Sequence, residues 1–377
     1  MSEKVFLKVI LGIPLVKALR RYRFHDITAT LTGGAVARRA DQRPSGRAAT
    51  LEDVARLAGV SIATASKALN GRTHVSAATR TTVLEAAARL SYSPNALAQG
   101  LRAVRTGIVG LLTSDLEGRL SIPILMGAED AFGVGRTSVL LCDARGDAIR
   151  EARHLETLLS RRVDGLIVVG ARPDPRPSVG RDLPVPVVYA YAPSEDPDDL
   201  SLVSDNISGG RMAIRHLTDV GRRSVAHITG DPDYGAAQDR ATGALAELAE
   251  QGLELAGGRV YFGSWSETWG RSATRMLLSQ TRDVDAVFAG SDQIARGVID
   301  TLHEAGLDVP GDVAVIGFDN WEIFTTSSRP PLSSVDMNLE TLGRVAAERL
   351  SGALGGDLRT GVESLPCRLV PRESTSA

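Results

Sequence analysis

Residues 59–72, GVSIATASKALNGR, decide the fold of the N-terminal part of this 377-residue chain. The run begins with a glycine and ends with an Asn-Gly pair, which typically stops a helix. Ser61 is placed to cap a helix of roughly two turns, and its inward residues Ala65, Ala68 and Leu69 allow close packing. The residues on either side decide whether this helix is an ordinary surface element or one that contacts DNA.

Two more short helices are predicted next to this run. Thr50 and Asp53 have the T-x-x-D spacing of a capping box, and apolar residues recur on one face up to Gly59, which ends the first helix. Ser76 caps a third helix, which carries apolar residues at Val83, Leu84, Ala87 and Leu90. Three short helices with a glycine turn before the second are typical of a helix-turn-helix, whose second helix enters the major groove. A helical cap on an α/β enzyme is the alternative from these residues alone.

Charge is distributed unevenly along the chain. Residues 1–107 carry 17 lysines and arginines against 6 acidic residues, a net charge of +11 in a chain whose total is -2. A basic N-terminal segment on an acidic body predicts contact with a polyanion. Lysine occurs only at positions 4, 8, 17 and 67, which excludes a P-loop or Schiff-base lysine from the large C-terminal part.

The cysteines and the N-terminal segment point to the cytoplasm. Cys142 and Cys367 are far apart and show neither a disulfide framework nor metal-ligand spacing. The apolar run at 5–19 contains Lys8, lacks a small-residue cleavage site and is shorter than the roughly 20 residues of a membrane span. We therefore predict neither a signal peptide nor a membrane anchor. Residues 1–48 are interpreted as a flexible basic extension, or as the result of a start codon placed upstream of the real one.

From Gly107 onward, buried strands alternate with amphipathic helices. The predicted strands are at 107–114, 137–143, 163–170, 185–191, 223–230, 284–290 and 312–318. The predicted helices are near 122–133, 147–162, 208–221, 238–252 and 291–306. This alternation predicts two successive doubly wound α/β units, and a cleft between two such units usually holds a small ligand.

Two stretches carry a resemblance to a known family: TLEDVARLAGVSIATASKALNG (50–71) and HVSAATRTTVLEAAARLSYSPNALAQGLR (74–102). With G-V-S-x-x-T-x-S, H-V-S and Y-S-P-N, the chain resembles the lactose-repressor (LacI/GalR) family of bacterial transcription regulators from Thr50 to about residue 370. The resemblance implies an N-terminal all-α helix-turn-helix domain. It further implies a periplasmic-binding-protein-like α/β effector domain of two doubly wound subdomains.

The resemblance also implies domain limits. The helix-turn-helix domain occupies 49–93, a hinge helix and linker 94–105, and an effector-binding and dimerisation domain 106–377. Within the last, the N-subdomain comprises 106–205 and 338–365, and the C-subdomain 206–337 and 366–372.

Three residues of the second helix are implied to face base edges: Ile62, Ala63 and Lys67. Polar residues are frequent in the family at the first two positions. Here these two side chains can only touch thymine methyls or exclude polar edges, whereas Lys67 can donate to guanine O6 and N7. We therefore expect Lys67 to supply most of the hydrogen-bonded readout. The residues expected at phosphates are Ser61, Thr64, Ser66, Asn70, His74 and Thr79, and Thr50 completes the helix-turn-helix contacts.

Residues 95–102 resemble the family's hinge helix, which packs against its partner in a dimer and presses a leucine into the minor groove. Leu101 occupies the leucine position, and Asn95 and Ala98 belong to the expected DNA contacts. Alternatively, Leu97 and Leu101 pack on the domain below. A glycine inside this helix costs roughly 1 kcal/mol relative to alanine, so we expect a hinge that is helical only on DNA.

The resemblance implies an effector site in the cleft. Its expected residues are Thr113, Ser114, Arg240, Trp265, Ser291, Asp292 and Asp319. An aromatic face for ring C–H groups, with Arg and Asp for paired hydroxyls, suits a sugar. Ser291 replaces the asparagine often found there, which leaves the particular sugar open, and a purine or other metabolite is the alternative effector. Trp265 as a core aromatic and Asp319 as a helix cap are the structural alternatives, whereas a helix cap is the favoured interpretation of Asp205-Asn206.

An enzyme is the rival class. The four histidines beyond residue 107 have neither H-E-x-x-H spacing nor cysteine partners, and the chain contains no G-x-S-x-G or G-x-x-x-x-G-K motif. We therefore predict no catalytic residues, metal or cofactor. A free-standing periplasmic binding protein would need a signal peptide and no helix-turn-helix. The expected protein is a cytoplasmic, homodimeric repressor of carbohydrate-metabolism genes, which binds a near-palindromic operator in double-stranded DNA.

Overall fold

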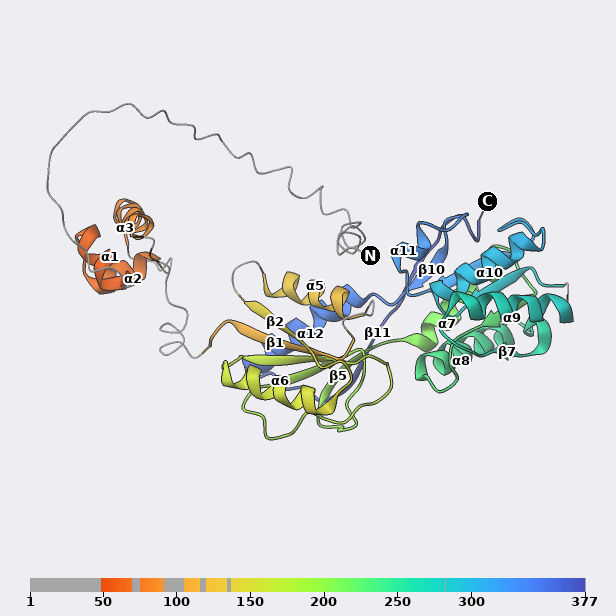
Figure 1. The fold of residues 1–377 in the computed structure, drawn as a ribbon, viewed down its shortest axis with the longest axis horizontal. Coiled ribbons are helices and arrows are strands. Elements are labelled where there is room, and N and C mark those ends of the chain that lie inside the picture. Colours follow the sequence, from red (N-terminus) through yellow and green to blue (C-terminus); the bar gives the residue numbers. More distant parts are fainter. Residues whose placement is uncertain are drawn as a thin grey trace, which may run out of the picture. The chain divides into compact units, whose positions relative to one another are not determined.

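The computed structural model describes residues 49–69, 75–90, 92, 105–115, 120–133, 137–281 and 283–376. The chain divides into two compact units, Met1–Ser93 and Pro94–Ala377 (Figure 1). Among the described residues, every helix is too short or too polar to span a lipid bilayer.

The N-terminal unit consists of the helices α1 (Leu51–Ala58), α2 (Ile62–Leu69) and α3 (Ala77–Arg89) around a small core. The predicted capping box is confirmed, since the Thr50 side chain accepts from the Asp53 N–H and the Thr50 N–H donates to Asp53. Gly59 ends α1 in the left-handed conformation, at φ +66°. The core residues are Val54, Ala55, Ala65, Ala68, Val83, Ala86 and Ala87. Leu84, from the apolar set of the third helix, is half exposed instead of buried.

The α/β unit contains two six-stranded sheets, one in each subdomain. In spatial order, the first sheet consists of β11 (Gly361–Leu365), β5 (Leu200–Ser204), β4 (Val187–Ala190), β3 (Gly165–Val169), β1 (Ile108–Thr113) and β2 (Ser138–Asp143). The second consists of β12 (Arg368–Val370), β10 (Ser333–Asp336), β9 (Ala314–Phe318), β8 (Ala286–Ala289), β6 (Val225–Ile228) and β7 (Val260–Tyr261). Neighbouring strands are parallel except β10 and β12, which are antiparallel.

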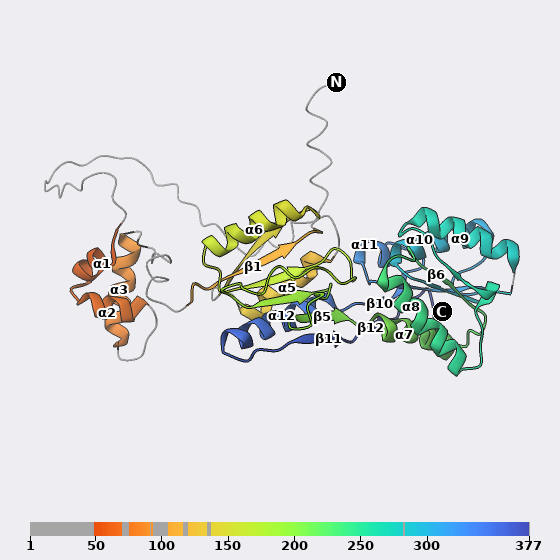
Figure 2. The same ribbon diagram turned by 90° about the horizontal axis from the view of Figure 1, so that it is seen from below.

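Helices cover both sheets (Figure 2). Those of the first subdomain are α5 (Ser121–Phe132), α6 (Ala148–Ser160) and α12 (Leu339–Leu354). Those of the second are α7 (Asn206–Asp219), α8 (Gly235–Glu250), α9 (Glu267–Gln280), α10 (Asp292–Glu304), α11 (Glu322–Thr325) and the 3-10 turn η3 (Ala256–Gly258). The chain passes from one subdomain to the other after β5, β10 and β11, so both subdomains are built from separate stretches of sequence.

The seven predicted strands and five predicted helices of this unit are confirmed, with shifts of a few residues at their ends. The sequence prediction missed β5, β7, β10, β11, β12, α9, α11 and α12. It also placed the start of α8 at residue 238, whereas the helix begins at Gly235.

Two glycines let α5 and α12 touch along their backbones. A Cβ on Gly127 would lie 1.8 Å from the carbonyl oxygen of Glu340, and one on Gly343 would lie 2.0 Å from that of Ile124. Helix backbones give way less easily than side chains, so these positions exclude any side chain.

We expect Gly127→Ala to lower the free energy of unfolding by roughly 2–4 kcal/mol, because the new methyl group forces the two helices apart. Gly352→Ala is the matched control, since its Cβ would lie no closer than 3.5 Å to any neighbour. The control should be neutral or slightly stabilising, as alanine favours helix. Urea unfolding followed by circular dichroism measures both; equal stability of the two variants would contradict this packing.

His227, on β6, is a fully buried histidine in the second subdomain. Its Nδ1 lies 2.8 Å from the carbonyl oxygen of Phe288, and its ring stacks on Phe288 at a centroid distance of 4.3 Å. Burial lowers its pKa from 6.5 to about 4; the contact with the Phe288 carbonyl opposes this shift, and Arg240 adds to it. The folded state therefore binds fewer protons at this site than the unfolded state between these two pKa values.

The free energy of unfolding should therefore fall as the pH is lowered through this window, by about 2 kcal/mol between pH 7.5 and 5 from His227 alone. His227→Leu should remove this contribution, so the stability difference between the two proteins should change with pH by that amount. Parallel urea unfolding at the two pH values measures it. A difference independent of pH would show that His227 does not resist protonation.

Candidate nucleic-acid interface and ligand cleft

Helix α2 presents one face to solvent and one to the core. Ala65 and Ala68 are buried, whereas Ile62 is half exposed and Ala63 and Lys67 are exposed. The three residues expected at base edges therefore share the accessible side of the helix. A face of this kind is what a recognition helix offers to the major groove.

Hydroxyl groups gather at the N-terminal ends of α2 and α3. Ser61 Oγ lies 2.8 Å from Thr64 Oγ1, and Ser76 Oγ lies 2.8 Å from Thr79 Oγ1. Both serines also accept a backbone N–H of the first turn, as predicted caps. Helix N-termini with nearby hydroxyls suit phosphate oxygens.

The other expected DNA contacts either gain little support from the structure or lie outside the described residues. Thr50 Oγ1 donates to Asp53 at 2.7 Å, and Ser66 is half-buried on α2. Asn70, His74, Asn95, Ala98 and Leu101 lie outside the described residues, and so does the expected hinge helix. Their DNA-contacting roles stay predictions.

A cavity of about 300 Å³ lies between the two subdomains of the α/β unit. Its lining residues are Asp115, Leu120, Ala171, Pro173, Tyr191, Tyr234, Ala236, Arg240, Trp265, Gln293, Asp319 and Trp321. Three of the residues expected from the sequence meet here: Arg240, Trp265 and Asp319. The sequence prediction missed two polar lining residues, Asp115 and Gln293, and three aromatic ones, Tyr191, Tyr234 and Trp321.

Arg240 is the buried cation of this cavity. Its Nε donates to Asn206 Oδ1 at 2.9 Å, and its Nη1 lies 3.3 Å from Asp319 Oδ1 and also donates to the carbonyl of Gly290. Its guanidinium lies 3.7 Å from the ring centroid of Phe318. An arginine this buried needs both a counter-ion and several acceptors, and here it has them.

Aromatic rings form another part of the wall. Trp265 and Tyr234 meet edge to face with centroids 5.8 Å apart, and the Arg240 guanidinium lies 5.7 Å from the Trp265 ring. The buried indole Nε1 of Trp265 has no hydrogen-bond acceptor within the described residues. Trp265 also packs against the core of the second subdomain, so it is both a core aromatic and a cavity residue. The cavity thus has apolar ring faces beside a buried guanidinium.

The remaining expected effector residues do not line the cavity. Thr113 is buried and lies 2.6 Å from Ser121 Oγ, and Ser114 follows β1 half-buried. Ser291 caps α10 by accepting the Ile294 N–H. Direct ligand contacts of these three residues stay predictions.

Asp292 holds a cavity residue in place. One of its carboxylate oxygens accepts the backbone N–H of Trp321 and the other the Ser334 hydroxyl, both at 2.7 Å. Asp205 caps α7 as expected, whereas its neighbour Asn206 binds Arg240. Asn206 therefore orients the Arg240 side chain, whereas Asp292 fixes the backbone at Trp321.

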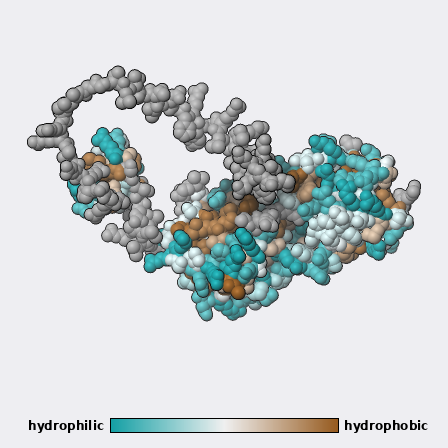
Figure 3. All heavy atoms as spheres, viewed as in Figure 1, coloured by the Kyte–Doolittle hydropathy of each residue, from teal (hydrophilic) through white to brown (hydrophobic). Residues whose placement is uncertain are grey.

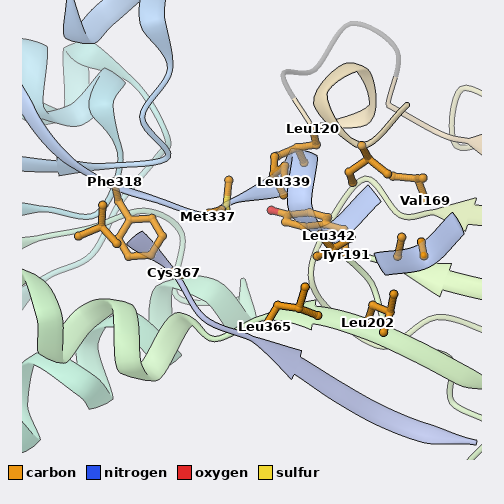
Figure 4. Packing of buried hydrophobic residues seen from close by; sticks show 14 of the residues in the cluster. Leu120, Val169, Tyr191, Leu202, Phe318, Met337, Leu339, Leu342, Leu365 and Cys367 are labelled. Carbon is orange, nitrogen blue, oxygen red and sulfur yellow. The ribbon is translucent and has the colours of Figure 1, made fainter. Parts of the chain in front are cut away.

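Apolar residues fill the junction between the subdomains. Phe318, Met337 and Cys367 lie where the crossing segments meet (Figure 4). Burial raises the pKa of the Cys367 thiol to about 12, so this cysteine stays protonated and packs as an apolar residue. Within the described ranges, no group of three His, Cys, Asp or Glu side chains is arranged to hold a metal ion.

Comparison with known proteins agrees with this architecture. Residues 50–95 match the bacterial regulatory proteins of the lacI family, and residues 214–375 match the periplasmic binding protein-like domain. The chain is 36% identical over 306 residues to the ribose operon repressor of Escherichia coli (strain K12), covering 80% of this chain and 92% of that protein. It is also 36% identical over 332 residues to the HTH-type transcriptional regulator CelR of Thermobifida fusca, covering 86% and 96%.

Solved structures show the same relationship. A lac repressor dimer bound to operator and an anti-inducer superposes with a TM-score of 0.69 at 28% identity, covering 88% of this chain and 100% of that one. A complex of the regulator CelR with cellobiose superposes with a TM-score of 0.57 at 32% identity, covering 86% and 99%. The chain therefore belongs to the LacI family of bacterial regulatory proteins.

Proposed function

We propose that this protein is a homodimeric transcriptional repressor that binds a near-palindromic operator and responds to a sugar. The observation that carries the proposal is the pairing of two features in one chain. One is an accessible face of α2 in a basic N-terminal unit, and the other is a cavity between the two subdomains with a buried arginine and aromatic walls. The relatives are transcriptional regulators, which favours regulation over catalysis.

The proposed DNA contacts are those expected from the sequence. Ile62, Ala63 and Lys67 contact base edges, and Lys67 carries the polar discrimination. Ser61, Thr64, Ser66, Asn70, His74 and Thr79 contact phosphates, and Leu101 enters the minor groove. Thr50, Asn95 and Ala98 are further proposed DNA contacts.

A sugar is the proposed effector. The cavity offers ring faces for C–H groups and a guanidinium paired with a carboxylate. The structural relative CelR is solved with cellobiose, and another relative is a ribose operon repressor. Both favour a sugar over a purine. Arg240, Trp265 and Asp319 are the proposed direct contacts, with Thr113, Ser114, Ser291 and Asp292 in support.

An exposed apolar surface supports a homodimer. On α5, Ile122 and Met126 are exposed, and Figure 3 shows hydrophobic residues gathered over this part of the α/β unit. Ile323 on α11 is a further large exposed apolar residue, and such surfaces commonly mark subunit contacts. The structurally related lac repressor is solved as a dimer on its operator. A twofold dimer presents two recognition helices and so requires a near-palindromic site.

A thermal-shift screen of the full chain with D-ribose, cellobiose, other sugars and purines tests the effector assignment. We expect at least one sugar to raise the melting temperature in a concentration-dependent way, because a ligand bound only to the folded state stabilises it. Trp265→Ala should abolish that shift. A shift with purines and with no carbohydrate would contradict the sugar assignment and favour the purine alternative.

A further inference from the structure

Residues 171–174 follow β3 in the first subdomain, and alternate residues of this segment contact the cavity and the second subdomain. Ala171 and Pro173 line the cavity between the subdomains. Arg172 and Asp174 instead contact the loop and helix start at 233–235 of the second subdomain. One short segment of the first subdomain thus lines the proposed effector cavity and also contacts the second subdomain.

Arg172 makes three contacts at this place. Its Nη2 donates to the carbonyl oxygen of Asp233 at 3.0 Å, and its Nε donates to Asp174 Oδ2 at 3.2 Å. Its guanidinium carbon lies 3.8 Å from the ring centroid of Tyr234, which itself lines the cavity. Arg172 therefore holds the Tyr234 ring from the side of the first subdomain.

Asp174 supplies a helix cap across the subdomain boundary. Its Oδ1 accepts the Gly235 N–H at 2.8 Å, at the first residue of α8. In the described structure the N-cap residue of α8, Tyr234, makes no side-chain capping bond of its own. A Cβ on Gly235 would lie 3.0 Å from Asp174 Oδ1, which shows how closely the two subdomains approach. The carboxylate also lies favourably at the positive end of the helix that carries Arg240.

We propose that residues 171–174 form a clasp that holds the two walls of the cleft together, with Arg172 and Asp174 as positioning residues for effector binding. The identity of the cavity as the effector site rests on the proposed function; the clasp itself does not. Opening the cleft breaks the cap on α8 and the contact with Tyr234 together. A ligand that contacts Ala171, Pro173 or Tyr234 acts directly on the same segment and so shifts the balance between open and closed cleft.

The clasp is suited to reversible opening. The Arg172 and Asp174 side chains are 46% and 31% exposed, so water competes for both. The loss of one side-chain cap shifts a folding or closing equilibrium about fivefold, and the loss of an exposed cation–π contact shifts it by a factor of about two to five. Each substitution should therefore open the cleft by such a factor without unfolding the protein.

Hydrogen exchange at the Gly235 amide of the ligand-free full chain tests this directly. Arg172→Ala keeps the Asp174 carboxylate as an acceptor and removes its Arg172 partner, so faster exchange at Gly235 in this variant reports separation of the Gly235 amide from Asp174. We expect an acceleration of about two- to fivefold. Arg181→Ala is the matched control, because Arg181 also pairs with a nearby aspartate, Asp196, but within the first subdomain. The control should leave the exchange of Gly235 unchanged.

Acrylamide quenching of tryptophan fluorescence gives an independent readout, since two of the three tryptophans, Trp265 and Trp321, line the cavity. Quenching should increase in both Arg172→Ala and Asp174→Ala, and less in Asp174→Asn, which keeps an acceptor oxygen. Unchanged exchange and unchanged quenching in folded Arg172→Ala would overturn the clasp, as would equal effects in Arg181→Ala. Both measurements are made without ligand, so a failure of the sugar assignment would leave their result standing.

Discussion

Replacing Arg240 with alanine is expected to abolish the response to effector and to destabilise the α/β unit by roughly 3–5 kcal/mol. The substitution leaves the Asp319 carboxylate, whose side chain is 4% exposed, without its guanidinium, and it removes the donor to Asn206. Effector affinity should fall by more than about 100-fold, because a buried charge-assisted contact and the shape of the cavity are lost together. Urea unfolding and calorimetric titration with the sugar found by thermal shift measure the two effects.

Arg211→Ala is the matched control for the loss of an arginine. Arg211 pairs with Glu247 and Glu250 on the outer face of α7 and α8, and Glu247 keeps Arg215 as a partner when Arg211 is removed. Its loss should cost less than about 1 kcal/mol and leave effector binding intact. Normal sugar affinity and stability in Arg240→Ala would refute the role given to this residue.

Replacing Lys67 with alanine is expected to weaken binding to the preferred operator by about tenfold or more for each half-site, and to relax base preference there. The reason is chemical. Ile62 and Ala63 offer no side-chain donor or acceptor, so the exposed lysine of α2 is left with the hydrogen bonds to bases. Binding-site selection followed by fluorescence anisotropy at one fixed salt concentration measures preference and affinity.

Arg56→Ala provides the control on the same unit. Arg56 is an exposed cation on α1, 3.2 Å from Asp53, and does not lie on the recognition helix. Its removal takes away one positive charge, so any weakening should be uniform across sequences. An unchanged base preference in Lys67→Ala would show that discrimination arises elsewhere.

The N-terminal unit could be predicted closely because its helix ends are encoded locally. Thr50, Asp53, Gly59 and Ser61 lie within one turn of the ends that they determine, and all four act there as expected. Seven of the α/β strands were likewise visible as apolar runs, whereas β5, β7, β10, β11 and β12 were missed. The start of α8 was predicted three residues late, near 238, and its first turn depends on a distant residue. Its first turn is capped by Asp174, 61 residues earlier in the chain, and no local pattern can show such a partner.

The ligand cavity was predictable only in part. Arg240, Trp265 and Asp319 were found through the family resemblance, while Tyr234 and Trp321 were missed. These aromatic residues lie in loops beyond the carboxyl ends of β6 and β9, where ligands of doubly wound sheets bind. Counting aromatic residues in those loops would have identified them. Asp292 was expected to contact the ligand because of the family resemblance. Its carboxylate instead accepts hydrogen bonds from the backbone of Trp321 and the hydroxyl of Ser334.

Operator binding by the full chain, titrated with and without the sugar found by thermal shift, tests the central claim most directly. The claim is that one chain couples a ligand in the cleft to contact between α2 and DNA. We predict that saturating sugar moves the midpoint of operator binding at least about fivefold, and that the shift disappears in Arg240→Ala. A sugar that binds tightly in the cleft and leaves the operator midpoint unchanged would contradict the account.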